Sequence, residues 1–253
     1  MLKVVIAGVS GRMGHALLDG VFSDSSLQLH AALDRVGSAM LGRDAGEQFG
    51  KVSGIKITSD IAAALQGADV LVDFNRPEAS LQYLQACEQA KVKLVIGTTG
   101  FNETEKSAIE HAAQQTGIVF APNMSVGVTL LINLVEQAAR VLNDGYDIEV
   151  VEMHHRHKVD APSGTALRLG EAAAKGIDKA LKDCAVYARE GVTGERETGT
   201  IGFATLRGGD VVGDHTVVLA GTGERVELTH KASSRATFAQ GALRAAKFLA
   251  DKP

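Results

Sequence analysis

LKVVIAGVSGRMG, the sequence of residues 2–14, combines a short apolar run, a glycine-rich turn and the start of a helix. The run at residues 3–7 is typical of a strand that is covered on both faces. The glycines permit a tight turn and close approach of a ligand to the backbone, and a helix N-terminus offers free N–H groups to a pyrophosphate. The spacing is GxxGxxG, with Ser10 at the second glycine of the usual GxGxxG dinucleotide motif. The pattern is weak by itself, and a strand-turn-helix without a ligand is the alternative.

The alternation of apolar runs and helical patterns continues through the first half of the chain. We predict strands at residues 3–7, 27–33, 68–74, 93–97 and 118–121, and helices at 12–21, 77–89 and 103–115. Pro77 suits a first helical turn, and Asn102 with Glu105 three residues later resembles a capping box. This order predicts an α/β fold with a Rossmann-like, doubly wound parallel sheet.

The pattern changes near residues 123–125. A helix at 126–142 and a strand at 147–153 come next, followed by a helix at 165–175 and strands at 185–189, 200–206, 215–220 and 225–230 that have no helices between them. These segments predict a second α+β domain with an open mixed sheet at residues 126–234. The first domain would then comprise residues 1–125 with a returning C-terminal helix in 235–253, and would bind the dinucleotide.

Composition narrows the functional classes. The chain has 253 residues, is 45% hydrophobic and has a formal net charge of -4, which argues against a nucleic-acid binder that relies on a basic surface. No apolar run approaches the ~20 residues of a membrane span, and the N-terminus has no signal-peptide pattern. The two cysteines, Cys87 and Cys184, lack the spacing of metal ligands, so we expect reduced thiols and a cytoplasmic protein without a membrane partner.

Three further stretches follow predicted strands of the first domain. Asp34 could accept hydrogen bonds from ribose hydroxyls, as NADH requires, while Arg35 could pair with the extra phosphate of NADPH, and a merely solvated pair is the alternative. Ligands of open parallel sheets bind at the carboxyl ends of the strands. The stretches Gly97, Thr98, Thr99 and Ala121, Pro122, Asn123, Met124 are therefore placed to flank the nicotinamide, although each alone could be a simple turn.

EMHHRHKVDAPSGT, residues 152–165, is a strongly cationic segment with three histidines. In an extended strand His154 would point opposite to His155 and His157, so the three imidazoles would not converge on one ion. We also find no carboxylate or cysteine partner of the kind such sites use, and we therefore expect no metal. A solvated basic loop is a further alternative.

The same alternation places His154, Arg156 and Lys158 on one face for as long as the strand lasts. A titratable imidazole beside a fixed positive charge suits protonation of a carbanion-like centre while a carboxylate is held. A helix then begins near Gly164 and Thr165, and its N–H groups with the Thr165 hydroxyl would form a second anion site. A dicarboxylate substrate is the simplest interpretation of two neighbouring anion sites.

Five motifs together resemble the 4-hydroxy-tetrahydrodipicolinate reductase (dihydrodipicolinate reductase) family over nearly the whole chain. They are GVSGRMG at residues 8–14, VIGTTGF at 95–101, APNMSVG at 121–127, HHRHKVDAPSGT at 154–165 and GTIG at 199–202. The histidine-lysine motif is far more specific than the glycine turn. The resemblance implies an NADH- or NADPH-dependent oxidoreductase that reduces a cyclic unsaturated dicarboxylate in the diaminopimelate route to lysine.

The resemblance also implies residue roles and an assembly. His154 matches the family's proton donor/acceptor and Lys158 its second proton donor, while His155, Gly164 and Thr165 match substrate-binding positions. The matching cofactor contacts are Gly8, Val9, Ser10, Gly11, Arg12, Met13, Asp34, Arg35, Gly97, Thr98, Thr99, Ala121, Pro122, Asn123 and Met124. The second domain would also build a homotetramer through its sheet.

Two departures from the family pattern are visible. Asn75 stands where the family usually has Thr or Ser, which we expect to alter cofactor affinity or preference more than activity, and the chain ends soon after Leu249. Two other classes stay open from the residues alone. An oxidoreductase such as a semialdehyde dehydrogenase would need a catalytic cysteine, and a nucleotide-sensing protein would bind NADH without consuming it.

Overall fold

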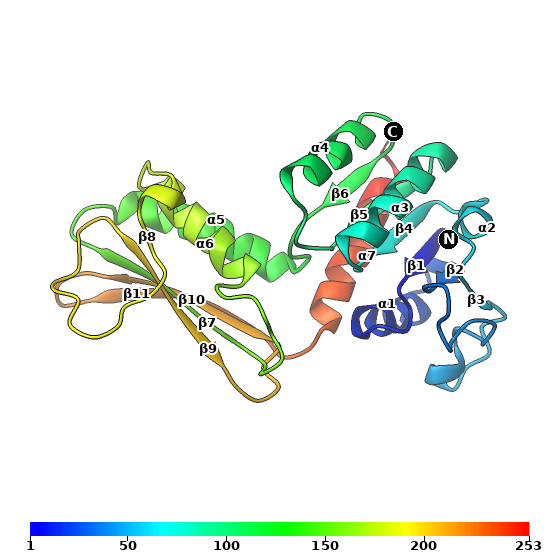
Figure 1. Ribbon diagram of the computed structural model, residues 1–253, viewed down its shortest axis with the longest axis horizontal. Coiled ribbons are helices and arrows are strands. Elements are labelled where there is room, and N and C mark those ends of the chain that lie inside the picture. The colour runs from blue at the N-terminus through cyan, green and yellow to red at the C-terminus, as the bar shows by residue number, and fades with distance from the viewer. Residues whose placement is uncertain (253) are drawn as a thin grey trace. The chain divides into compact units, whose positions relative to one another are not determined.

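The computed structural model describes residues 1–252 and divides into two compact units (Figure 1). Unit 1 comprises Met1–Ser125 together with the segment from Arg235 onward, and unit 2 comprises Val126–Ser234. None of the helices within residues 1–252 has the length and apolar character needed to cross a membrane.

Unit 1 is built on a six-stranded parallel sheet in the order β3-β2-β1-β4-β5-β6. Its strands are β1 (Leu2–Ala7), β2 (Leu27–Leu33), β3 (Ile57–Thr58), β4 (Val70–Asp73), β5 (Lys93–Ile96) and β6 (Ile118–Phe120). The helices are α1 (Arg12–Ser23), α2 (Ile61–Leu65), α3 (Pro77–Ala90), α4 (Glu103–Ala112) and α7 (Ala236–Ala250). The crossover from β3 over the central β1 to β4 is the doubly wound arrangement, so the predicted fold class is confirmed.

Apolar side chains cover both faces of this sheet. Val4 and Ile6 of β1 pack with α1 and α7, while Val5 and Ala7 pack with α3 and α4 on the opposite face. Local signals in the sequence explain where two helices begin. Pro77 is the first residue of α3, and Asn102 and Glu105 form the complete capping box of α4.

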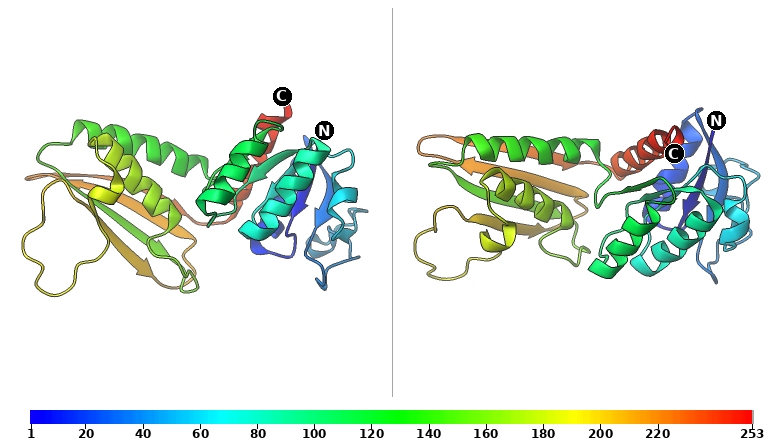
Figure 2. Two further views of the ribbon diagram at one scale, coloured as in Figure 1. Left: turned by 45° about the horizontal axis from the view of Figure 1, so that its top comes forward. Right: turned by 90° about the horizontal axis from the view of Figure 1, so that it is seen from above.

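Unit 2 has a five-stranded mixed sheet in the order β11-β10-β7-β9-β8. The central β7 (Asp147–His154) pairs antiparallel with β10 (Gly213–Ala220) and parallel with β9 (Ile201–Arg207), while β11 (Arg225–Ala232) and β8 (Ala185–Val186) form the edges. Helices α5 (Val126–Val141) and α6 (Gly164–Gly176) lie side by side over one face (Figure 2). Ile148, Val150 and Val217 face these helices in the core of the unit.

The structure differs from the sequence prediction in short elements. β3 and α2 have two and five residues, too few to show a hydrophobic period, and the sequence analysis missed them. The strand predicted at 185–189 stops at Val186. β7 ends at His154, where the chain turns and the Lys158 N–H donates to the His155 carbonyl over 3.1 Å. The predicted shared face of His154, Arg156 and Lys158 is therefore wrong, because strand alternation stops at the first of them.

Candidate active site

The buried face of β7 changes from apolar to ionisable along its length. Side chains alternate in a strand, and Ile148, Val150, Glu152 and His154 are all buried on the side covered by α5 and α6. Strand β10 adds His215 directly opposite Glu152, in register with the apolar pair Val217 and Val150. At the His154 end of β7, the buried side chains of unit 2 are therefore ionisable instead of apolar.

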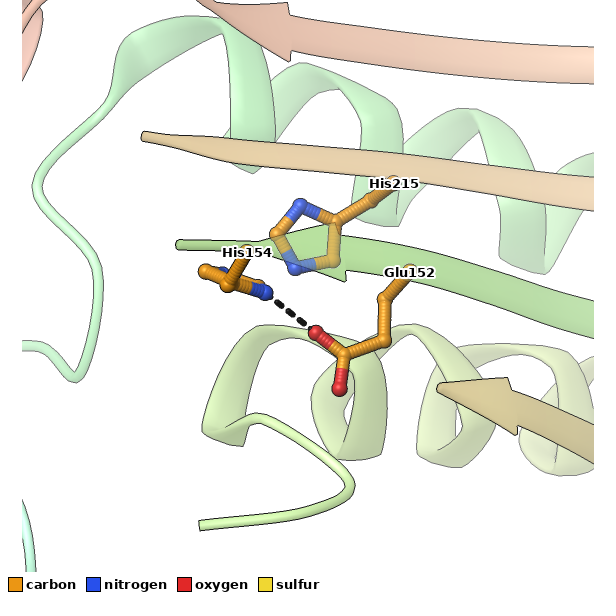
Figure 3. Close-up of side chains that lie close together, drawn as sticks. All are labelled: Glu152, His154 and His215. Atoms are coloured by element: carbon orange, nitrogen blue, oxygen red, sulfur yellow. Dashed lines mark ion pairs between the residues drawn. The ribbon is translucent and has the colours of Figure 1, made fainter. Parts of the chain in front are cut away.

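Glu152 is 1% exposed and forms the centre of this cluster (Figure 3). Its Oε2 forms an ion pair with Nδ1 of His154. Its Oε1 accepts from the Ser163 N–H at 3.1 Å, the Thr205 hydroxyl at 3.2 Å and the Arg207 guanidinium at 3.3 Å. Burial acts to raise the pKa of the carboxyl, but the contacts with His154 and Ser163 and the charge of Arg207 lower it to about 2. Glu152 is therefore a carboxylate at neutral pH.

His215 stands beside His154 with the ring centroids 5.0 Å apart, edge to face. Its Nε2 lies 3.1 Å from the Ser163 hydroxyl. Burial, followed by the neighbouring His154, lowers the pKa of His215 to about 4. His215 is therefore a neutral imidazole at neutral pH, so the cluster combines one carboxylate with one uncharged histidine around His154.

The loop after β7 holds Lys158 next to an acidic partner. The Lys158 ammonium lies 2.8 Å from Asp160 Oδ1, and Arg207 donates to the Asp160 carbonyl over 2.5 Å. Burial raises and the Lys158 contact lowers the pKa of the Asp160 carboxyl, with a net decrease. Lys158 is also among the charges that lower the pKa of His215. The structure therefore places Lys158 near the buried cluster although it does not continue the strand.

The predicted substrate-binding positions lie where this loop meets α6. Ser163 caps the helix, because its hydroxyl accepts from the Ala166 N–H at 3.1 Å. Gly164 and Thr165 are the first two helical residues, and a Cβ on Gly164 would meet open space. His155 is half-buried, with its ring centroid 6.2 Å from that of His157. Gly164 and Thr165 thus form the beginning of a helix whose dipole favours an anion.

In unit 1, the glycine turn fits the backbone requirements of a dinucleotide site. Gly8 has φ +72°, and a Cβ on Gly14 would overlap the Gly8 carbonyl, so neither position accepts a side chain without a shift. Gly11 is the N-cap of α1 and provides no side-chain cap, while Ser10, Gly11 and Arg12 are exposed. Val9 is buried, with its N–H donating to the Leu33 carbonyl at 3.1 Å, and Met13 is half-buried.

Asp34 follows the last residue of β2, as the sequence analysis predicted. It is 6% exposed, with Oδ1 accepting from the Arg35 N–H at 2.9 Å and Oδ2 from the Ser38 hydroxyl at 2.7 Å. These bonds fix the carboxylate at the carboxyl end of the sheet, where a ribose would be held. The Arg35 side chain is exposed and has the reach of a phosphate ligand.

The other predicted cofactor stretches also follow strands of this sheet. Gly97 follows β5 and lies against the Phe74 ring, which a Cβ would overlap, and Thr98 contacts the buried Asp73 at 3.3 Å. Burial raises the pKa of Asp73, although the Ser80 hydroxyl and Asn75 donate to it. Ala121, Pro122, Asn123 and Met124 follow β6, and the Met124 carbonyl lies against Gly241 of α7, where a Cβ would overlap it. Thr99 and Pro122 are exposed.

Residues 1–252 contain one group with the types and spacing of metal ligands, namely Glu152, His154 and His215, whose ligand atoms lie within 4.8 Å of one another. This set differs from His154, His155 and His157, the three histidines that were weighed as metal ligands from the sequence. The expectation from the sequence that no carboxylate lies nearby is incorrect, because Glu152 shares the face of His154 two residues earlier. The ion pair of Glu152 with His154 and the Ser163 contact of His215 already engage these side chains within the protein.

Four cluster residues were missed by the sequence analysis. They are Glu152, Ser163, Arg207 and His215. Strand alternation places Glu152 on the buried face of β7 with the apolar Ile148 and Val150, which was a usable signal. His215 alternates with Val217 and Leu219 in the same way, but its place opposite Glu152 depends on strand pairing, which the local pattern does not give.

A doubly wound sheet with a glycine turn and a fixed acidic residue after β2, together with a second sheet that carries a buried cluster of one carboxylate and two histidines, is the arrangement of an NAD(P)-dependent oxidoreductase of the two-domain type. Family models narrow this class. Residues 2–124 match the N-terminal domain, and residues 127–253 the C-terminal domain, of dihydrodipicolinate reductase. The chain belongs to the dihydrodipicolinate reductase family.

Known relatives agree over almost the whole length. The chain is 64% identical over 248 residues to the 4-hydroxy-tetrahydrodipicolinate reductase of Thiobacillus denitrificans, covering 98% of this chain and 93% of that protein. It is 61% identical over 248 residues to the enzyme of the same name from Laribacter hongkongensis, again covering 98% and 93%. A dipicolinate-bound dihydrodipicolinate reductase from Paenisporosarcina sp. TG-14 has the same fold, with a TM-score of 0.76 at 24% identity, covering 98% and 94%.

Proposed function

We propose that this oxidoreductase reduces 4-hydroxy-tetrahydrodipicolinate to tetrahydrodipicolinate in the diaminopimelate route to lysine, with NADH or NADPH as reductant. The observation that carries the proposal is the buried Glu152–His154 pair, set beside Lys158 and the start of α6 in a chain of this family. In the overall reaction the 4-hydroxy substrate loses water, and one hydride and one proton are added to the conjugated imine.

The residues of unit 1 fit the cofactor. The turn of Gly8 and Gly11 would receive the pyrophosphate at the start of α1, and Asp34 would accept from the adenosine ribose. Arg35 beside Asp34 supports use of NADPH as well as NADH. When bound, the reduced nicotinamide supplies the hydride.

The residues of unit 2 would bind the substrate and deliver the proton. Gly164 and Thr165 at the start of α6 would bind one carboxylate, and the cationic loop with His155 would bind the other. Addition of hydride to a ring carbon conjugated with the imine leaves an enamine, which His154 and Lys158 would protonate. The imidazole of His154 suits this exchange because histidine is the side chain that most often transfers protons in catalysis, and this one lies against the buried Glu152 carboxylate.

The alternative with a catalytic cysteine has no support in either thiol. Burial raises the pKa of Cys87 to about 12, and burial also raises the pKa of Cys184. A thiol that stays protonated is a poor nucleophile at neutral pH. We also propose a cytoplasmic homotetramer formed through the sheet of unit 2, on the basis of the family resemblance.

The test is a coupled assay. The condensation product of aspartate semialdehyde and pyruvate is generated enzymatically and offered with NADH and then with NADPH, and loss of absorbance of the reduced nicotinamide is followed. We expect rapid oxidation that disappears in the His154→Ala, Lys158→Ala double variant. The ratio of the two rates reports how Asp34 and Arg35 rank the cofactors.

A matched control is His157→Ala, which removes an exposed imidazole of the same loop. It should retain most of the rate, which would show that loss of a polar side chain from this loop is not by itself the cause. Binding of NADH without oxidation by the unsubstituted chain would contradict the proposal and favour a nucleotide-sensing protein.

A further inference from the structure

We propose that Glu152 is a positioning residue that holds the His154 imidazole in one tautomer and orientation for proton transfer, with Gly213 keeping the opposite ring nitrogen accessible. The inference rests on the proposed function, since it assigns roles within the same site. It concerns residues other than the predicted proton donors, and three features of the cluster support it.

The first feature is that the two carboxylate oxygens of Glu152 contact different groups. Oε1 accepts hydrogen bonds from Ser163 at the start of α6 and from Thr205 and Arg207 of β9. These three donors anchor the carboxylate. Oε2 is then left to the His154 Nδ1, so the one oxygen not used for anchoring is directed at the imidazole (Figure 3).

The second feature is the chemistry of this pair. An ionised carboxylate only accepts hydrogen bonds, so the Nδ1 that contacts it carries a hydrogen. In the neutral ring this leaves Nε2 as the nitrogen that gains and loses the catalytic proton. The same logic applies to a buried acid that orients a histidine base in other enzymes, where the acid itself stays ionised.

The third feature is the glycine beside Nε2. A Cβ placed on Gly213 of β10 would lie 3.0 Å from His154 Nε2 and 3.6 Å from His215 Cε1. Any larger residue would therefore crowd the nitrogen that must meet the substrate. The backbone of Gly213 has no positive φ, so access to Nε2, rather than backbone conformation, explains the glycine.

Among the charged groups around His154, Glu152 is the anion that contacts its ring directly. His215 from β10 is neutral, Arg207 from β9 and Lys158 from the following loop are cationic, and Asp160 in that loop pairs with Lys158. Glu152 is thus the carboxylate in contact with the His154 ring, while Arg207 and Lys158 carry positive charge near the pair. Removal of the Glu152 charge should therefore change the pH dependence of the reaction.

The test compares Glu152→Gln with the unsubstituted full-length enzyme, measuring kcat and KM across the pH range. Glutamine keeps the shape of the side chain and removes its charge. We expect kcat to fall ~10²-fold and the high-pH limb of kcat to move to lower pH, with the KM for NADH unchanged. An unchanged kcat and pH profile would overturn the proposal, because a merely structural role would not move the pH limb.

Glu149→Gln is the matched control. Glu149 lies on the other face of β7 and pairs with Arg189 and Arg196 at 2.8 Å and 3.1 Å, so this variant also removes a β7 carboxylate that is paired with arginine. Its kcat and pH profile should match those of the unsubstituted enzyme. Equal losses in both variants would overturn the specific role of Glu152.

A measurement without turnover separates this inference from the proposed function. In ¹⁵N-histidine NMR spectra of the unsubstituted enzyme, the neutral His154 should carry its hydrogen on Nδ1, with assignment by the His154→Gln variant. This result would hold even if the chain failed to oxidise NADH with the proposed substrate. An Nε2–H tautomer would overturn the proposal, including in the case that Glu152→Gln does not fold.

Discussion

The two predicted sites of this molecule are built from different parts of the chain. In unit 1, the glycine turn places backbone groups at the start of α1. Glycine is needed at positions 8 and 14 because a Cβ at either would overlap neighbouring atoms. In unit 2, Glu152, His154 and His215 lie on adjacent strands and contact one another through their side chains. A backbone site is encoded by consecutive residues, whereas a side-chain cluster depends on strand pairing, so the two sites should fail in different ways.

The largest effect is expected for Lys158→Ala in unit 2. The variant removes the ammonium beside the cluster and should lower kcat by ~10²-fold or more, if Lys158 assists protonation. Because the change lies outside the glycine turn, the dissociation constant for NADH should stay the same. Steady-state rates and fluorescence titration with NADH measure the two quantities, and normal turnover would remove Lys158 from the mechanism.

Gly14→Ala should produce the opposite pattern in unit 1. The new Cβ would overlap the Gly8 carbonyl and approach the Val9 Cα at 2.6 Å, and these backbone atoms cannot move aside without reshaping the turn. We expect a loss of about 3 kcal/mol in the free energy of unfolding together with weaker NADH binding. Urea denaturation and NADH titration test this.

Gly164→Ala is the corresponding control in unit 2, because a Cβ there meets open space. It should leave the stability almost unchanged. Equal destabilisation by the two alanine substitutions would contradict the view that Gly14 is a requirement of close backbone packing.

Acid should destabilise the protein through His215. Its pKa is lowered from 6.5 to about 4 in the folded state by burial and by His154. A depressed folded pKa means that the contribution to stability is complete above the unfolded pKa and is lost as pH falls toward the folded value, since the unfolded chain binds the proton first. Between about pH 7 and about pH 5 this linkage lowers the free energy of unfolding by about 2 kcal/mol.

The measurement is urea denaturation at several pH values, with His215→Gln as the comparison. Glutamine can still bond to the Ser163 hydroxyl but does not titrate, so its stability curve should be flatter between these pH values. Parallel curves for the two proteins would show that other groups cause the acid sensitivity.

The cofactor site of unit 1 was predicted from the sequence more completely than the cluster of unit 2. Local patterns encode the first, whereas strand pairing forms the second. The alternation of strands and helices, the glycine turn and Asp34 after β2 were local patterns, and the predicted fold class is confirmed. His154 and Lys158 were selected from their motif, and their roles remain proposals. Glu152 was overlooked although strand alternation gave its face, and His215, which follows it by 63 positions in the sequence, is brought opposite it only by the pairing of β10 with β7.

The smallest effect is expected at Asn75, the position that departs from the family pattern. Its side-chain amide donates to Asp73 Oδ1 at 2.7 Å, and its amide oxygen lies where a Cβ on Gly8 would be. Asn75 therefore joins the buried Asp73 to the glycine turn. A threonine retains a hydroxyl donor but is shorter and does not cover Gly8 in the same way.

Asn75→Thr should accordingly change the KM for NADH or NADPH by about 3-fold, or less than 1 kcal/mol, with kcat within about 2-fold of the unsubstituted enzyme. Parallel steady-state assays with the two cofactors measure the change. A large fall in kcat would mean that Asn75 acts on the reacting groups and not on the shape of the turn. An unchanged KM for both cofactors would show that the Asn75 side chain does not affect the turn, which would make the contrast between the backbone site and the side-chain cluster sharper still.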